Sequence, residues 1–256
     1  MVEPLYDEAE VYDVAFGWDL TEEVAWLRGR LDVPGPCATV LEPACGTGRH
    51  LHALAQQGVG GIGVDAAPSM LAVARRRLAD APVPVDLLCA DVRAFTADRP
   101  VQGAICPLNS LAHLPDDAAM AAHLARMAAH LPSGARYLVQ LDLRDPADPA
   151  AAVGYGTWDV TRGAWTVRAT WWVLAVDLAA ATELHRAELE VRRGPRAGEV
   201  IRDTLRLTAW TPERWAAVVA ASAFDQVAAY DGDDPERPPV PVGSPGDLRW
   251  HELVRA

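Results

Sequence analysis

Between residues 37 and 143, apolar segments of strand length alternate with segments of helix length, and this alternation limits the fold more than any other feature. Strands are expected at 37–41, 61–65, 83–91, 101–106 and 135–143, and helices at 49–57, 68–78 and 116–131. Strands and helices that alternate at this spacing form βαβ units, whose right-handed crossovers place helices on both faces of a parallel sheet. The sequence therefore predicts an α/β fold.

A different pattern follows residue 145. Residues 145–156 are expected to form a loop, and three segments with alternating apolar and polar residues come after it, at 165–176, 183–193 and 199–210. We expect these segments to form a small antiparallel sheet inserted within residues 150–210. A helix that starts at Thr211 and Pro212 follows, and two C-terminal segments complete the main sheet.

Composition excludes several classes of protein. The formal net charge of −12 argues against nucleic acid or a membrane surface as a partner, because both need a basic surface. All 23 basic residues are arginine, which excludes lysine Schiff-base enzymes and P-loops that use lysine. The four cysteines form no CxxC pair, so no metal site is expected. No leader or membrane span is evident, and a cytoplasmic protein is expected.

The segment VLEPACGTGRH, residues 40–50, joins the first strand to the next helix through a turn of small residues. Such a turn presents backbone N–H groups to a ligand, and small residues let the ligand lie against the main chain. Leu51 stands where the dinucleotide-binding pattern GxGxxG has its third glycine. Glu42, before the turn, favours a ligand with positive charge over a pyrophosphate.

Acidic residues stand at the carboxyl ends of three predicted strands, as Glu42, Asp65 and Asp91. In an open parallel sheet these ends meet at the edge where ligands bind. Carboxylates gathered there accept hydrogen bonds from cationic and donor groups. Each acid taken alone has another explanation, because aspartate also caps helices.

At these positions the sequence resembles the class I S-adenosylmethionine-dependent methyltransferases, whose first motif reads acid-x-Gly-x-Gly-x-Gly. Glu42, Ala44, Gly46 and Gly48 match it, with alanine in the first glycine position. The resemblance implies S-adenosyl-L-methionine as the cofactor. It also implies a Rossmann-like seven-stranded sheet of order 3-2-1-4-5-7-6 with helices on both faces.

The same resemblance assigns further contacts to the cofactor. Asp65 would accept hydrogen bonds from both ribose hydroxyls, with Ala66 beside it, and Met70 would lie near the adenine. Asp91 would accept a hydrogen bond from the adenine amino group, and the N–H of Val92 would lie near the ring.

The segment CPLNSLAHL, residues 106–114, resembles the fourth-strand segment of small-molecule methyltransferases, including amino-sugar and glycine N-methyltransferases. Leu108 and Asn109 are expected at the cofactor. His113 is the first candidate base for an amine or hydroxyl proton, and packing against the next helix is the equal alternative. Asp142, at the end of the fifth strand, is the second candidate base.

Aromatic residues at the N-terminus and in the inserted strands are candidates for the walls of a pocket. Residues 1–33 are expected to be helical over most of their length and, by the resemblance, to form a lid in which Tyr12 contacts the cofactor. Arg168 and His185 are candidate polar contacts to the substrate, although an isolated arginine says little in a chain without lysine.

The sequence thus predicts a single methyltransferase domain over residues 1–256. It would transfer a methyl group from S-adenosyl-L-methionine to nitrogen or oxygen of a small molecule, as a monomer or homodimer, with no metal, nucleic acid or membrane involved. Two alternatives remain: a protein that binds the cofactor without turnover, and a nicotinamide-dependent oxidoreductase.

Overall fold

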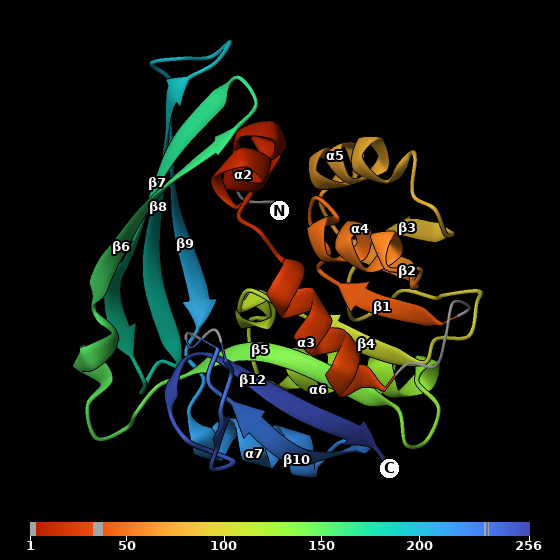
Figure 1. Ribbon diagram of the computed structural model, residues 1–256. Coiled ribbons are helices and arrows are strands. Elements are labelled where there is room, and N and C mark those ends of the chain that lie inside the picture. Colours follow the sequence, from red (N-terminus) through yellow and green to blue (C-terminus); the bar gives the residue numbers. More distant parts are fainter. Residues whose placement is uncertain (1–3, 33–37, 233, 235) are drawn as a thin grey trace.

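The computed structural model describes residues 4–32, 38–232, 234 and 236–256, which form a main sheet of eight strands, a second sheet of four strands and the helices around them (Figure 1). Cys37, where the first strand was expected to start, lies outside the described residues. Among the helices of the described ranges, none is long and apolar enough to cross a membrane.

Parallel strands form the centre of the main sheet: β1 (Thr39–Pro43), β2 (Gly60–Asp65), β3 (Val85–Cys89), β4 (Gly103–Cys106) and β5 (Arg136–Leu143). The antiparallel part consists of β12 (Gly246–Arg255), β10 (Phe224–Tyr230) and the short edge strand β11 (Pro239–Val240). The order β3-β2-β1-β4-β5-β12-β10 follows the predicted 3-2-1-4-5-7-6, which confirms the Rossmann-like fold. The sheet differs from the prediction by the added edge strand β11.

Helices cover both faces of this sheet (Figure 1). On one face lie α3 (Thr21–Leu31), α4 (Arg49–Gln56) and α5 (Pro68–Leu78), and on the other α6 (Asp117–His130) and α7 (Pro212–Ala220). The helix starts follow local chemistry, because the side chains of Asp116 and Thr211 cap α6 and α7 by accepting backbone N–H bonds. Pro68 occupies the first turn of α5.

Two glycines of β2 allow α4 and the small-residue turn to lie close to the sheet. A Cβ atom at Gly61 would lie 2.6 Å from Leu51 Cδ2. A Cβ atom at Gly63 would lie 2.7 Å from both Leu51 Cδ1 and Cys45 Sγ. Any larger side chain would overlap these atoms. The close approach brings the turn at residues 44–48 next to the carboxyl end of β2, where Asp65 stands.

The second sheet contains β6 (Gly154–Arg162), β7 (Trp165–Asp177), β8 (Thr182–Arg193) and β9 (Val200–Thr208), paired antiparallel in chain order. The expected loop at 145–156 and the expected count of three strands were wrong, because β6 forms a fourth strand after a short helix, η2 (Pro149–Ala152). Most of β6 is exposed, so its residues need no apolar alternation, and backbone pairing with β7 holds it.

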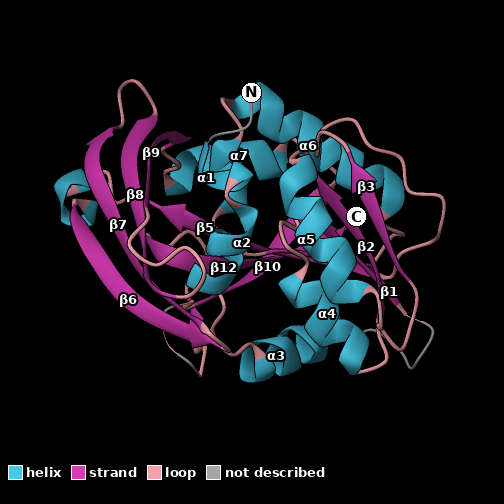
Figure 2. Ribbon diagram, turned by 90° about the horizontal axis from the view of Figure 1, so that it is seen from above, coloured by secondary structure: helices cyan, strands magenta, loops and turns pink. Residues whose placement is uncertain are grey.

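The N-terminal region is three helices rather than one long helix: α1 (Pro4–Asp7), α2 (Ala9–Ala15) and α3. The chain turns at Gly17, and Asp19 Oδ1 then accepts hydrogen bonds from the backbone N and Oγ1 of Thr21 at the start of α3. The break lets α2 leave the direction of α3 and lie between the second sheet and α5, with which it makes contacts (Figure 2).

Candidate active site

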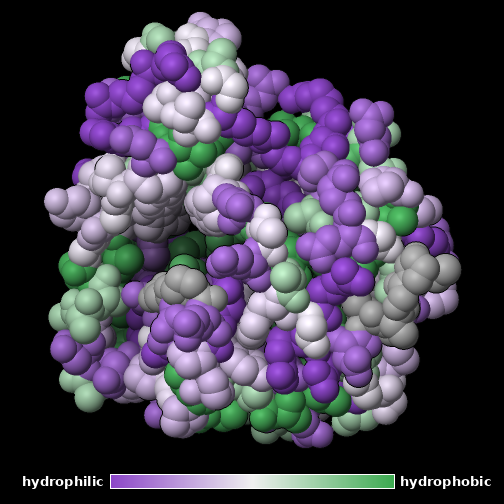
Figure 3. Space-filling view, in the orientation of Figure 1, coloured by the Kyte–Doolittle hydropathy of each residue, from purple (hydrophilic) through white to green (hydrophobic). Residues whose placement is uncertain are grey.

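A cavity of about 980 Å³ lies where the carboxyl ends of the main-sheet strands, the N-terminal helices and the second sheet meet. Figure 3 shows a hollow beside the second sheet on this face of the molecule. Most of the predicted site residues line the cavity: Tyr12, Ala44, Gly46, Asp65, Ala66, Met70, Asp91, Val92, Leu108, Asn109, His113 and Asp142. Residues far apart in the sequence therefore share one chamber.

The glycine turn forms part of the cavity wall with its main chain. Ala44 and Gly46 have left-handed backbones, with φ values of 55° and 53°. A Cβ atom added to Gly46 would meet no atom within 4 Å, so open space lies directly against the backbone there. The turn is therefore shaped for a ligand to approach the main chain closely.

Asp65 fixes the geometry of this turn from the end of β2. Its Oδ2 accepts a hydrogen bond from the backbone N of Gly46 at 2.7 Å, and its Oδ1 accepts one from Ala67 N at 2.8 Å. Burial raises the pKa of Asp65, and these backbone hydrogen bonds act in the opposite direction. Each carboxylate oxygen has a second acceptor position for a donor in the cavity.

Asp91 stands beyond the end of β3, which stops at Cys89, two residues before the predicted end. Its carboxylate accepts hydrogen bonds from the guanidinium and the backbone N of Arg93. The hydrogen bond from the Arg93 side chain lowers the pKa of Asp91 to about 2. Asp91 is therefore an ionised acceptor at neutral pH, and it lies on the cavity wall.

Glu42 and Gly48 are not among the residues that line the cavity. Glu42 is 1% exposed, and its Oε1 lies 3.6 Å from His50 Nδ1. Burial raises the pKa of Glu42 well above its usual value. Gly48, with φ of 70°, packs against Ala74. Both residues support the turn from behind.

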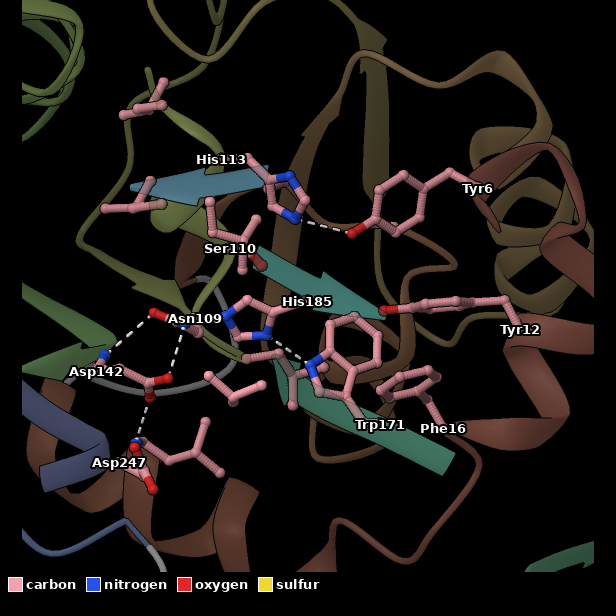
Figure 4. A pocket seen from close by; sticks show the side chains of 18 of the residues that line it. Tyr6, Tyr12, Phe16, Asn109, Ser110, His113, Asp142, Trp171, His185 and Asp247 are labelled. Carbon is pink, nitrogen blue, oxygen red and sulfur yellow. Dashed lines mark hydrogen bonds between the residues drawn. The ribbon is translucent and has the colours of Figure 1, made fainter. Parts of the chain in front are cut away.

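Several aromatic side chains close the cavity on the side of the N-terminal helices. Tyr12 stacks on Phe16 at a centroid distance of 4.2 Å, and Tyr6 meets Tyr12 edge-on at 5.6 Å. Tyr6 Oη and His113 Nε2 are 2.8 Å apart and share a hydrogen bond (Figure 4). His113 lies in the short helix η1 (Ser110–His113) after β4, so the sequence placed it correctly.

Asp142 lies on the cavity wall at the end of β5. Its Oδ2 accepts hydrogen bonds from Asn109 Nδ2 at 3.0 Å and from Arg144 Nη2 at 2.9 Å, and its Oδ1 accepts one from Leu248 N at 2.6 Å. Burial raises the pKa of Asp142 to about 6, while Arg144 acts to lower it. A carboxyl group with such a pKa is poised for proton exchange near neutrality.

Arg144 connects the two sheets beneath Asp142. It is 3% exposed, and it donates hydrogen bonds to both carboxylate oxygens of Glu183 at 2.7 and 2.8 Å. It also pairs with Asp247, which lines the cavity from β12. Sequence reasoning missed Arg144, Glu183 and Asp247, because Arg144 follows β5 while the other two lie in β8 and β12, and no local motif joins them.

His185 has both ring nitrogens engaged, and Figure 4 shows the hydrogen bond with Trp171. Trp171 Nε1, which can only donate, lies 2.8 Å from His185 Nδ1, so Nδ1 accepts. The proton of the neutral ring therefore lies on Nε2, which is 2.8 Å from Glu183 Oε2. His185 lines the cavity as expected, whereas Arg168 is absent from its wall and pairs with Asp159.

Comparisons with known proteins agree with this geometry. The family model described as "Methyltransferase domain" matches residues 40–134. A dTDP-3-amino-3,6-dideoxy-alpha-D-glucopyranose N,N-dimethyltransferase of Streptomyces fradiae is 38% identical over 49% of this chain and 50% of that protein. A ubiquinone biosynthesis O-methyltransferase of Xanthomonas campestris is 32% identical over 50% of this chain and 52% of its own length. The chain thus spans about half the length of the curated relatives it matches.

Among solved structures, S-adenosylmethionine-bound CalS10, an amino pentose methyltransferase from Micromonospora echinaspora, matches with a TM-score of 0.73. The match covers 96% of this chain and 97% of CalS10 at 24% identity, which shows a shared fold. Residues 40–134 therefore match a methyltransferase domain, and the chain shares the fold of CalS10.

The residues of the cavity fit S-adenosyl-L-methionine, the cofactor that the sequence predicts. The open space against Gly46 leaves room for a ligand at the turn, and Asp65 has acceptor positions beside it. No group of three or more potential metal ligands occurs among the residues that the structure describes.

Proposed function

We propose that this protein transfers a methyl group from S-adenosyl-L-methionine to the amino nitrogen of a small, amino-sugar-like acceptor. One observation carries the proposal: the cavity that contains the glycine turn and Asp65 also contains Asp142, a carboxyl group with a pKa near 6. The named N-methyltransferase relatives support an amine acceptor.

The bound cofactor supplies a methyl group on a sulfonium, which is already activated for displacement. Asp65 would accept hydrogen bonds from the ribose hydroxyls, with the turn at Gly46 against the rest of the ligand. Tyr6, Tyr12 and Phe16 exclude water from the reacting atoms, which strengthens the electrostatic interactions inside the cavity.

The acceptor side of the cavity is suited to a nitrogen that gains positive charge. Methyl transfer to a neutral amine would leave a positive charge on the acceptor nitrogen. Asp142 and Asp247 would stabilise that charge from the cavity wall, where Arg144 pairs with both carboxylates. Asp142 or His113 then accepts the proton that the methylated amine releases, or takes it beforehand from an ammonium.

Oxygen is the second candidate acceptor atom. The Tyr6–His113 hydrogen bond favours it, because a neutral imidazole held by a tyrosine can take the proton of a hydroxyl group. The O-methyltransferase relatives agree with this alternative. An oxygen acceptor needs His113 more than an amine does, since a neutral amine already carries its nucleophilic lone pair.

The test is turnover with a cofactor carrying a labelled methyl group and a panel of amino sugars, each matched with the sugar that has hydroxyl in place of the amino group. Label in the amines alone supports N-methylation, and label in the hydroxyl partners supports O-methylation. Cofactor binding without labelled product from any acceptor would favour the non-catalytic binding protein. The His113→Gln variant is expected to slow turnover at unchanged cofactor affinity, and wild-type rates would leave His113 a packing role.

We further propose that the protein acts in the cytoplasm without a nucleic-acid partner, as a monomer or homodimer. Cys45, Cys89 and Cys106 are free thiols, and the net charge is −12, which support a reducing compartment and a small-molecule substrate. Sedimentation of the purified protein measures the oligomeric state.

A further inference from the structure

Two glycines of the second sheet leave open space at the mouth of the cavity. Gly154 and Gly156 stand two residues apart on β6, are exposed and line the cavity. A Cβ atom added to either glycine would meet no atom of the described residues within 4 Å. Neither glycine has a positive φ, and β6 pairs with β7 without a bulge, so the backbone does not require glycine here. The remaining use of a glycine inside a strand is to let a ligand approach closely.

Apolar side chains of β6 and β7 stand beside this space. Gly156 pairs with Trp171, and Gly154 pairs with Val173. Residues directly opposite each other in an antiparallel pair project from the same face of the sheet, with Cβ positions about 4.5–5.5 Å apart. Trp158, two residues after Gly156, projects from that face as well. All three side chains line the cavity, so two indole rings and a valine border the space over the glycines.

Hydrogen bonds hold both indole rings in place. Trp171 donates from Nε1 to His185 Nδ1 at 2.8 Å, as Figure 4 shows. Trp158 donates from Nε1 to the carbonyl oxygen of Ala15 at 2.7 Å. Rings that are already held in one orientation bind a planar partner at a low cost in conformational entropy. The space over the two glycines is therefore suited to a planar apolar group.

The charge next to this space is negative. Three carboxyl groups, those of Asp142, Glu183 and Asp247, surround the single guanidinium of Arg144. The other arginine on the described part of the cavity wall, Arg93, is paired with an aspartate beyond β3. A phosphate group is bound by cationic side chains or by N–H groups, and like charges placed together are unfavourable. This side of the cavity therefore disfavours a ligand that carries phosphate.

An amine that carries a planar apolar group and no phosphate matches both features. We propose that the acceptor is such an amine, with its amino nitrogen at Asp142 and its planar group over Gly154 and Gly156. An amino sugar joined to an aromatic ring has this form, whereas the same sugar joined to a nucleoside diphosphate would bring two phosphates to a wall of carboxylates. This assignment rests on the proposed function, since it presumes methyl transfer to an amine in this cavity.

Turnover of three forms of one amino sugar by the wild-type protein tests the assignment. The phenyl glycoside should have a kcat/KM at least about tenfold above that of the methyl glycoside, because its ring gains contact with the indole rings. The sugar linked to a nucleoside diphosphate should fall at least about tenfold below the phenyl glycoside, because its phosphates meet like charge. Equal values for the phenyl and methyl glycosides, or a nucleotide-linked form that matches the phenyl glycoside, would overturn the assignment.

The variant Gly156→Leu fills the space over β6 at a position where the backbone accepts any residue. We expect it to lower kcat/KM for the phenyl glycoside at least about tenfold, and to leave kcat/KM for the methyl glycoside and the affinity for S-adenosylhomocysteine within about threefold. Thr157→Leu is the matched control, because Thr157 is the next residue of β6, is exposed and is absent from the cavity wall. It should leave all three quantities within about threefold.

The same loss for the phenyl glycoside in both variants, or a loss in neither, contradicts the placement of the planar group over Gly156. A different outcome concerns the proposed function: if the wild-type protein binds S-adenosylhomocysteine but methylates none of the three sugars and no other amine, methyl transfer to an amine is itself wrong.

Discussion

Replacing Arg144 with methionine tests whether the buried ionic network holds the two sheets together at the cavity. Arg144 is 3% exposed, and its principal partner Glu183 is 2% exposed. Removal of one member of a buried ion pair costs about 3–5 kcal/mol, because the remaining charge stays buried without compensation. The pair with Asp247 adds little, since the Asp247 side chain is 57% exposed.

For a protein of this size, about 1 kcal/mol shifts the melting temperature by about 2–4 °C, so Arg144→Met should lower it by about 6–20 °C. Urea unfolding followed by circular dichroism measures the free energy directly. Arg196→Met is the matched control, because Arg196 also joins two carboxylates, Glu8 and Glu199, but at a partly exposed site. We expect it to cost less than about 1 kcal/mol.

The double variant Arg144→Met/Glu183→Gln distinguishes two causes of lost stability: the buried Glu183 charge left without a partner, and the packing lost with the arginine side chain. Neutralising Glu183 should return at least about 1.5 kcal/mol to the Arg144→Met protein. Burial works to raise the pKa of Glu183, but the hydrogen bonds from His185 and Arg144 outweigh it and leave the pKa lowered. The stability that Arg144 provides through this pair is therefore present at neutral pH and lost as the pH falls below the ordinary range of glutamate. A loss below about 1 kcal/mol, or no recovery in the double variant, would refute this reasoning.

Further predictions concern single residues of the site. Asp65→Ala should reduce cofactor affinity at least about tenfold in calorimetry, because the ribose hydroxyls and the backbone N–H of Gly46 lose their acceptor. Unchanged affinity would show that Asp65 does not bind the ribose. The pH profile of kcat/KM should fall as the pH drops through about 6, where Asp142 takes up its proton, and Asp142→Asn should lack this limb. Ala44→Gly should raise the melting temperature by about 2–4 °C, because alanine is strained at φ 55°, and a lower value would contradict that strain. Gly63→Ala should cost about 1–3 kcal/mol in urea unfolding, since its Cβ would lie 2.7–2.8 Å from three neighbouring side chains; a neutral result would mean that the neighbours move aside.

Local chemistry made the central part of the fold predictable. Strand length, helix length and the residues that start helices are properties of neighbouring residues, so α5 was expected at the residues where it lies. The seven-strand order came instead from the family resemblance. Asp65 was predictable because it ends a strand, and strand ends in a parallel sheet meet at one edge. The strand β6 was missed since an exposed strand needs no apolar alternation.

Tertiary structure decided the properties of the residues on the side of the cavity where the methyl acceptor is proposed to bind. The sequence was enough to name Asp142 as the end of β5. Its pKa of about 6, however, depends on burial, on the neighbouring Arg144 and on Glu183, which the second sheet brings close. His185 was visible as a candidate contact, yet its neutral state follows only from Trp171 on the adjacent strand.

The sequence by itself determined the strand-turn-helix unit and its carboxylates, because hydrogen bonding within a segment and the alternation of side chains act over a few residues. Only the tertiary structure decided which charges face one another, because burial and Coulomb interactions depend on distance in space. Asp142 shows both sides of this division: its place at the end of a strand follows from the chain, whereas its hydrogen bonds with Asn109 and Leu248 form only in the folded protein.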